Sequence, residues 1–167
     1  LLAGGDQNPL ETKSVNGTIR FLPADWARFT LNGGYDRVAG GSTPYFNVRG
    51  PRDYTLDGRT NQRSLATIDY YAANLKGEFD VDSLKTTITV IGAYNQSDYV
   101  GAGDADYSPF DFFRSTSNRT LKTRTGELRF DTKWSDRFTT LIGAFYAKSD
   151  TDSRGTTTVV KRSLHLV

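Results

Sequence analysis

Two polar stretches of this 167-residue chain carry side chains suited to binding a small ligand. One combines arginines with aromatic residues and the other combines aspartates with aromatic residues. The candidate ligand-binding residues are Arg49, Arg52, Tyr54, Tyr107, Phe110 and Phe112. A guanidinium offers paired donors to a carboxylate, and an aromatic ring offers a face for stacking. We therefore expect the arginine-bearing stretch to help capture an anionic chelate; the alternative is solvated loop charge and contact with lipopolysaccharide.

No other residues are arranged for chemistry. Cysteine is absent, which excludes thiol chemistry and cysteine-based zinc sites, and His165 is the single histidine. The 21 Lys and Arg residues nearly balance the 19 Asp and Glu residues, so the composition does not indicate nucleic-acid binding. Asp104 and Asp106 have two interpretations, as Ca²⁺ ligands or as ordinary loop charge. We predict no enzyme activity and no cofactor.

Apolar and polar residues alternate through most of the chain, which predicts β-strands. Short polar breaks such as Ser135-Asp136 join the strands in pairs. The three predicted hairpins span about residues 10–38, 70–97 and 122–150. Two long loops are predicted between them, at about residues 39–69 and 97–121. A further loop is expected at 151–155, and the weakly alternating residues 156–167 are a candidate seventh strand.

Charge lies on only one side of the predicted strands. The charged side includes Arg20, Arg28, Lys76, Glu78, Glu127 and Arg129. A soluble sandwich and an outer-membrane barrel would both give this division. The uncharged side carries glycine and alanine near the strand centres, where acyl chains fill gaps that a protein core would leave as voids. This composition favours lipid as the medium that covers the uncharged side.

Aromatic residues mark both ends of the uncharged side. Tyr71 and Phe79 are eight residues apart on one strand, which is about 26 Å along the strand. Strand tilt reduces the vertical span to about 20 Å, near the roughly 25 Å spacing of aromatic girdles in outer-membrane barrels. We predict an all-β fold, an antiparallel meander of six to seven strands that forms part of a transmembrane outer-membrane β-barrel, with no plug domain in this chain.

Three segments resemble barrel motifs of TonB-dependent outer-membrane receptors of the type found in Caulobacter- and Sphingomonas-like bacteria. They are GTIRFLPAD at 17–25, LKTTITVIGAY at 84–94, and GELRF followed by LIGAFY at 126–130 and 141–146. The resemblance covers about residues 10–150. It implies that the chain is an interior segment of a barrel of about 22 strands with a plug in its lumen.

The resemblance also implies a function and a set of partners. The parent protein would lie in the outer membrane of a Gram-negative bacterium and import a scarce nutrient such as a ferric siderophore, with energy from the TonB complex. Expected partners are outer-membrane lipid and lipopolysaccharide, the plug domain of the same protein, a small-molecule chelate and, indirectly, the TonB complex. The charged side would face the lumen, where its residues contact the plug or pair with one another along the wall. The alternatives are a passive porin or channel and a soluble β-sandwich adhesin or carbohydrate-binding module.

Overall fold

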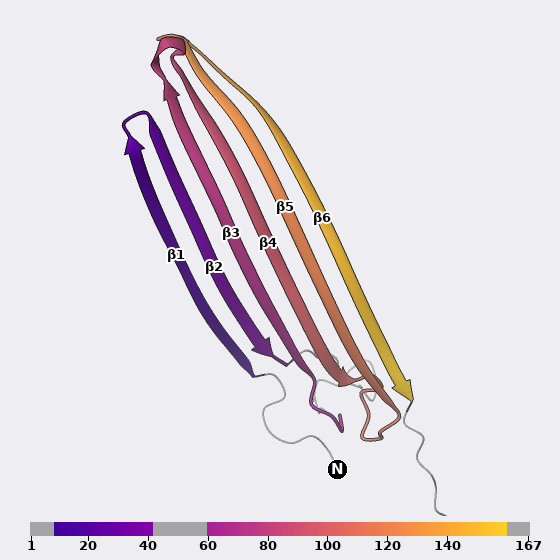
Figure 1. Ribbon diagram of the computed structural model, residues 1–167. Coiled ribbons are helices and arrows are strands. Elements are labelled where there is room, and N and C mark those ends of the chain that lie inside the picture. The colour runs from indigo at the N-terminus through magenta and orange to yellow at the C-terminus, as the bar shows by residue number, and fades with distance from the viewer. Residues whose placement is uncertain (1–8, 42–59, 160–167) are drawn as a thin grey trace, which may run out of the picture.

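The computed structural model describes residues 9–41 and 60–159, and these form one antiparallel sheet (Figure 1). The six strands lie side by side in chain order, with no crossover. They are β1 (Leu10–Ala24), β2 (Ala27–Gly40), β3 (Leu65–Val81), β4 (Thr86–Asp104), β5 (Phe113–Ser135) and β6 (Phe138–Val159). The predicted all-β meander is thereby confirmed, and the sheet is open because β6 does not pair with β1.

Tight turns join the strands at one end of the sheet, which is the upper end in Figure 1. The β1–β2 turn is formed by Asp25 and Trp26, between the paired residues Ala24 and Ala27, and Pro23 lies within β1 instead of at a central position of the turn. A single 3₁₀ turn, Asp82–Leu84, leads into β4 through Lys85, which adopts a left-handed φ of 50°. The β5–β6 turn includes an ion pair of 2.9 Å between Lys133 Nζ and Asp136 Oδ1. All three predicted short turns are therefore present.

The strands are longer at the opposite end than the sequence predicts. The predicted loop at 97–121 is wrong, because β4 continues to Asp104 and β5 begins at Phe113, which leaves only residues 105–112 between them. Residues 151–155 are likewise part of β6, and residues 156–159 continue β6 instead of starting a seventh strand. Both faces of these extensions are polar, so the alternation disappears while the backbone pairing persists.

The register places the uncharged sides of all six strands on one face. Ile19 pairs with Leu31, Leu31 with Leu75, and the same row continues through Gly92 and Gly126 to Tyr146. We call this surface the apolar face, and its large members include Ile19, Phe21, Phe29, Leu31, Leu75, Phe79, Ile88, Val90, Leu128, Phe130 and Ile142. The opposite surface, which carries Arg28, Lys76 and Glu127, is the polar face.

The described residues form a single layer without a conventional core. Ala27 is the only hydrophobic residue among them that is buried, at 1% exposure. Leu75, at the centre of the apolar face, keeps 49% of its surface exposed. A sheet needs a second surface to cover its hydrophobic side. The apolar face therefore has no covering layer within the described part of the chain.

Candidate functional site

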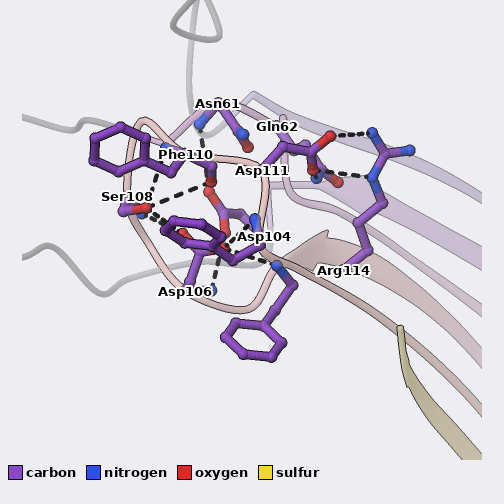
Figure 2. Close-up of polar contacts among 10 residues, drawn as sticks. Asn61, Gln62, Asp104, Asp106, Ser108, Phe110, Asp111 and Arg114 are labelled. Atoms are coloured by element: carbon purple, nitrogen blue, oxygen red, sulfur yellow. Dashed lines mark hydrogen bonds and ion pairs between the residues drawn. The ribbon is translucent and has the colours of Figure 1, made fainter. Parts of the chain in front are cut away.

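The loop between β4 and β5 holds three of the predicted ligand-binding residues and folds around one carboxylate (Figure 2). The Oδ1 atom of Asp106 accepts hydrogen bonds from the backbone N–H of Ser108, at 3.0 Å, and from its hydroxyl. Its Oδ2 atom accepts from the N–H groups of Phe112 and Phe113, at 3.2 and 2.9 Å. These four bonds tie both halves of the loop to one side chain, which fixes the loop conformation.

A second carboxylate anchors the loop to the strands. Asp104 is only 3% exposed, and its Oδ1 atom accepts from the N–H groups of Asp106 and Tyr107, at 3.0 and 3.1 Å. Its Oδ2 atom accepts from the N–H of Asn61, at 3.3 Å, just before β3. Gly103 allows this close packing, because a Cβ atom there would lie 2.5 Å from Ser64 Oγ. The loop base is therefore built from two segments about forty residues apart in the sequence.

Ion pairing and hydrogen bonding favour the ionised form of two loop carboxyl groups, those of Asp106 and Asp111. Arg114 lowers the pKa of Asp111 by a hydrogen bond, with Nη2 2.8 Å from Oδ2. Burial alone would raise the pKa of Asp106, but the bonds from Ser108, Phe113 and Phe112 outweigh it and lower the pKa. Both groups are thus anionic at neutral pH. Among the residues that the structure describes, no group of three acidic, histidine or cysteine side chains could hold a metal ion.

The loop presents aromatic rings to solvent on this fixed base. The rings of Phe110 and Phe112 lie 5.5 Å apart and are 57% and 52% exposed. Tyr107 has a left-handed φ of 53°, a strained conformation for a non-glycine residue. The exposed rings are available for stacking and apolar contact, and the role of Tyr107, Phe110 and Phe112 in ligand binding stays a prediction. The other three candidates, Arg49, Arg52 and Tyr54, lie outside the described residues, so their role in capture stays a prediction.

The charges of the polar face are largely paired within the wall. Lys76 Nζ lies 2.8 Å from Glu78 Oε1 on β3, and Arg129 contacts Glu127 on β5. Arg28 on β2 reaches Asp80 on β3, with Nη1 2.5 Å from Oδ2. Arg20, the sixth member of the predicted set, forms no ion pair with any described residue. These ion pairs thus lie within β3, within β5 and between β2 and β3, and the orientation of these residues toward a lumen stays a prediction.

The middle of the polar face is neutral. Thr18 donates to Asn32 at 2.7 Å, and Asn32 donates to Asn74 at 2.8 Å, so one ladder crosses three strands. Asn16 and Gly34 lie beside this ladder and help to line a shallow groove of about 310 Å³. The ladder could not be predicted from the sequence, because Thr18, Asn32 and Asn74 become neighbours only when the strands pair. The polar face thus carries a neutral hydrogen-bonding ladder next to the zone of paired charge near the tight turns.

Tyrosines mark one end of the apolar face. The rings of Tyr35 and Tyr71 are 5.1 Å apart, and Tyr94 and Tyr146 continue the row on β4 and β6. Beyond this row the same face becomes largely polar and charged. Its residues there include Lys13, Arg37, Asp69, Gln96, Asp98, Lys122, Arg124, Lys148, Asp150 and Asp152. The apolar face therefore ends at the tyrosine row although the strands continue past it.

Phenylalanine and tryptophan mark the other end of the apolar face, near the tight turns. Phe29 contacts Phe79 edge-to-face at 5.5 Å, and Phe79 lies 6.4 Å from Trp26. Trp134 on β5 donates from Nε1 to Thr140 on β6 at 2.9 Å. The apolar face is thus a band with aromatic residues along both of its edges.

Both aromatic rows slope across the sheet in the same direction. Tyr35 pairs with Tyr71, but Tyr71 pairs with Gln96, two residues beyond Tyr94. Gln96 pairs through Lys122 with Asp150, and Tyr146 lies four residues nearer the tight turns. From β2 to β6 the tyrosine row therefore shifts four residues toward the tight turns, on average one residue per strand.

The row at the turn end follows the same slope. Phe29 pairs with Gly77, two residues before Phe79, so the row is nearer the turns on β3 than on β2. Each residue advances about 3.3 Å along a strand, and neighbouring strands are about 4.8 Å apart. If the row is horizontal, a shift of one residue per strand therefore means that the strands tilt by about 35°.

None of the described residues form a helix that is long and apolar enough to cross a membrane. No protein-family model matches the chain, and no curated protein matches it.

Proposed function

We propose that this chain is part of the transmembrane wall of a TonB-dependent outer-membrane receptor, which imports a scarce nutrient such as a ferric siderophore. The observation that carries the proposal is the sloping apolar band. A belt of lipid is horizontal, whereas strands of an outer-membrane barrel tilt by about 35–45°. The boundaries of a lipid belt must therefore slope across the strand register, as both aromatic rows do here.

The height of the band also fits a bilayer. Tyr71 and Phe79 are eight residues apart on β3, which is about 26 Å along the strand. At a tilt of about 35° the vertical distance is about 21 Å, close to the roughly 25 Å apolar band of outer-membrane barrels. Tyrosine and tryptophan favour such boundaries because each ring has an apolar body and a polar tip.

The shape of the apolar face favours lipid over a second protein sheet. A Cβ atom added at Gly17, Gly92 or Gly126 would have no atom within 4 Å, so the surface has open gaps along its middle. A facing sheet would have to fill each gap with a matching side chain, because protein interiors pack densely. Fluid acyl chains fill such gaps without a matching shape.

The polar face and the β4–β5 loop support the transport part of the proposal. Most charges near the tight turns are already paired and the ladder is neutral, so an occupant of the lumen can contact much of this wall without separating ion pairs. The loop with Phe110 and Phe112 lies at the end of the sheet opposite the tight turns, where the outer loops of such a barrel would meet a ligand (Figure 1). Import driven by TonB rests on the resemblance of the three barrel motifs.

Uptake by intact cells tests the proposed function. We expect cells that carry the protein to accumulate a ⁵⁵Fe-labelled siderophore from a panel, and deletion of the gene or of TonB to abolish this uptake. Uptake that persists without TonB would instead indicate a passive porin. Release of the protein from membranes by alkaline carbonate, without detergent, would refute the membrane placement and favour a soluble sandwich.

The loop can be tested in the same assay. Replacing both loop rings (F110A with F112A) should raise the siderophore concentration needed for half-maximal uptake by about tenfold, since each stacking contact contributes about 0.5–1.5 kcal/mol. The matched control is V100A, which removes a side chain that is 57% exposed at the same end of β4. An unchanged half-maximal concentration in the double variant would remove the loop from the binding site.

A further inference from the structure

Three cations lie together on the outer surface of the sheet, directly beyond the tyrosine row. Arg124 on β5 and Lys148 on β6 are register partners. Lys122 is also on β5, two residues further from the tight turns than Arg124. All three are on the same surface as Leu128 and Phe130, the surface that lipid would cover. We call Lys122, Arg124 and Lys148 the cationic ledge.

The ledge has more positive charge than its surroundings neutralise. Like charges directly opposite each other on neighbouring strands are unfavourable, and Arg124 faces Lys148 in this way. Asp150 is the shared counter-charge, with Oδ2 3.2 Å from Arg124 Nη1 and Oδ1 3.7 Å from Lys148 Nζ. The same carboxylate faces Lys122 in the register. One carboxylate, Asp150, therefore faces all three cations, and Lys122 has a further electrostatic interaction with Asp98.

The remaining acidic groups on this surface lie further out. Asp98 and Asp152 are one row beyond Asp150, and Asp98 accepts hydrogen bonds from Thr120 and Gln96, at 2.7 and 2.6 Å. By contrast, several cations of the polar face have a carboxylate of their own, as Lys76 has Glu78 and Arg28 has Asp80. The excess of positive charge is thus concentrated at one height, between the tyrosines and the outer acidic row.

That height is where a lipid would place its headgroup. The guanidinium carbon of Arg124 lies 5.9 Å from the ring centre of Tyr94. On β6, Tyr146 is two residues nearer the tight turns than Lys148. The side chains of Arg124 and Lys148 are 56% and 57% exposed, so an anion can reach them from outside. Arginine binds phosphate oxygens in pairs, and lysine adds a point charge.

We propose that the cationic ledge binds the phosphate group of an outer-leaflet lipid whose acyl chains lie on the apolar face below. The proposal rests on the membrane placement of the proposed function. It assigns a lipid site to three residues that have no part in ligand capture or in the lumen. The lipid would supply the negative charge that allows Arg124 and Lys148 to stay opposite each other.

The test uses the intact protein, extracted and purified in detergent. Phosphorylated lipopolysaccharide from the host is titrated against it, and bound lipid is counted by native mass spectrometry. The test variant is R124Q with K148Q. The matched control is R119Q with K133Q, which removes the same charge from the opposite face of β5. A dephosphorylated lipopolysaccharide and inorganic phosphate are run as competing probes.

We expect the ledge variant to bind the phosphorylated lipid about thirtyfold more weakly, because each cation near an anionic headgroup contributes about 1 kcal/mol. The control variant should bind as the natural protein does. Equal binding by both variants would overturn the ledge while leaving the membrane placement intact. Full competition by millimolar inorganic phosphate would also overturn it, in favour of a free-phosphate site. A protein that leaves membranes without detergent would refute both proposals.

Discussion

A charge placed at the centre of the apolar face tests the medium that covers it. Leu75 lies four residues from both Tyr71 and Phe79, about 13 Å along the strand from each boundary. At a tilt of about 35° its depth is about 11 Å, the middle of the band. Arginine at the midplane of an outer-membrane barrel costs about 2–4 kcal/mol, falling to about 0–1 kcal/mol near the interfaces. We therefore expect L75R to lower the free energy of unfolding by about 2–4 kcal/mol.

The measurement is reversible urea unfolding of the intact protein in phospholipid vesicles, followed by tryptophan fluorescence. The matched control is A93R, because Ala93 lies on the neighbouring strand one register row away, at nearly the same depth, and faces the polar side. We expect A93R to change the free energy of unfolding by less than about 0.5 kcal/mol, the usual effect of a surface substitution. The difference between the variants isolates the face from the effect of arginine itself.

An equal cost for L75R and A93R would refute the reasoning, since it would mean that both faces meet the same medium. The depth series gives a second check. The same substitution at Val100, which lies beyond the tyrosine row on the same face of β4, should cost less than about 1 kcal/mol. A cost at Val100 as large as at Leu75 would contradict a lipid boundary at the tyrosines.

Three further predictions concern the small residues and the loop. We expect G92L to insert and fold normally, because a Cβ atom at Gly92 meets open space; a loss of more than half the outer-membrane yield would contradict this. G103A should destabilise the loop base by about 1–3 kcal/mol, because the new methyl group would lie 2.5 Å from Ser64 Oγ, and faster protease cleavage of the β4–β5 loop measures the effect. The pKa of Asp106 is lowered in the folded loop, so its ionised carboxylate stabilises the loop. This stabilisation is fully present above the ordinary carboxyl pKa of about 4 and is lost as the pH falls through the lowered pKa of Asp106. Hydrogen exchange at the Phe113 N–H should therefore accelerate in acid, whereas D106N should exchange faster already at neutral pH and respond less to acid.

The sequence predicted the hairpins well where the two faces of a strand meet different surroundings. From Gly126 to Phe130 each step changes from apolar to polar, and the structure confirms β5 there. The break at Ser135-Asp136 was equally clear, because its residue types favour turns. Pro23 marked the β1–β2 turn only approximately, since it lies in β1, two residues before Asp25. The shared face of the six strands followed from the same alternation and is confirmed by the register.

The strand extensions were not predictable from alternation. Residues 97–104 and 113–121 have polar side chains on both faces, so the period-two signal is lost where both faces meet water. Their pairing depends on cross-strand contacts such as the bond from Thr120 to Asp98, which no local pattern reveals.

The loop base was missed for a related reason. The spacing of Asp104 and Asp106 left two interpretations, Ca²⁺ ligands or ordinary loop charge, and neither predicted that their oxygens accept backbone N–H groups from both sides of the loop. An aspartate followed two residues later by serine is a signal for such a side-chain turn.

The open edges of the sheet carry a consequence for biogenesis. The outer side of β1 and the outer side of β6 have backbone N–H and C=O groups without a strand to meet them in the described part of the chain. Each such group would cost several kcal/mol in hydrocarbon. On the proposed function, this wall cannot slide into a bilayer first and seek its neighbours afterwards. Membrane entry and edge-to-edge recruitment must then proceed together, which makes the availability of a strand edge, rather than hydrophobicity, the step that limits assembly.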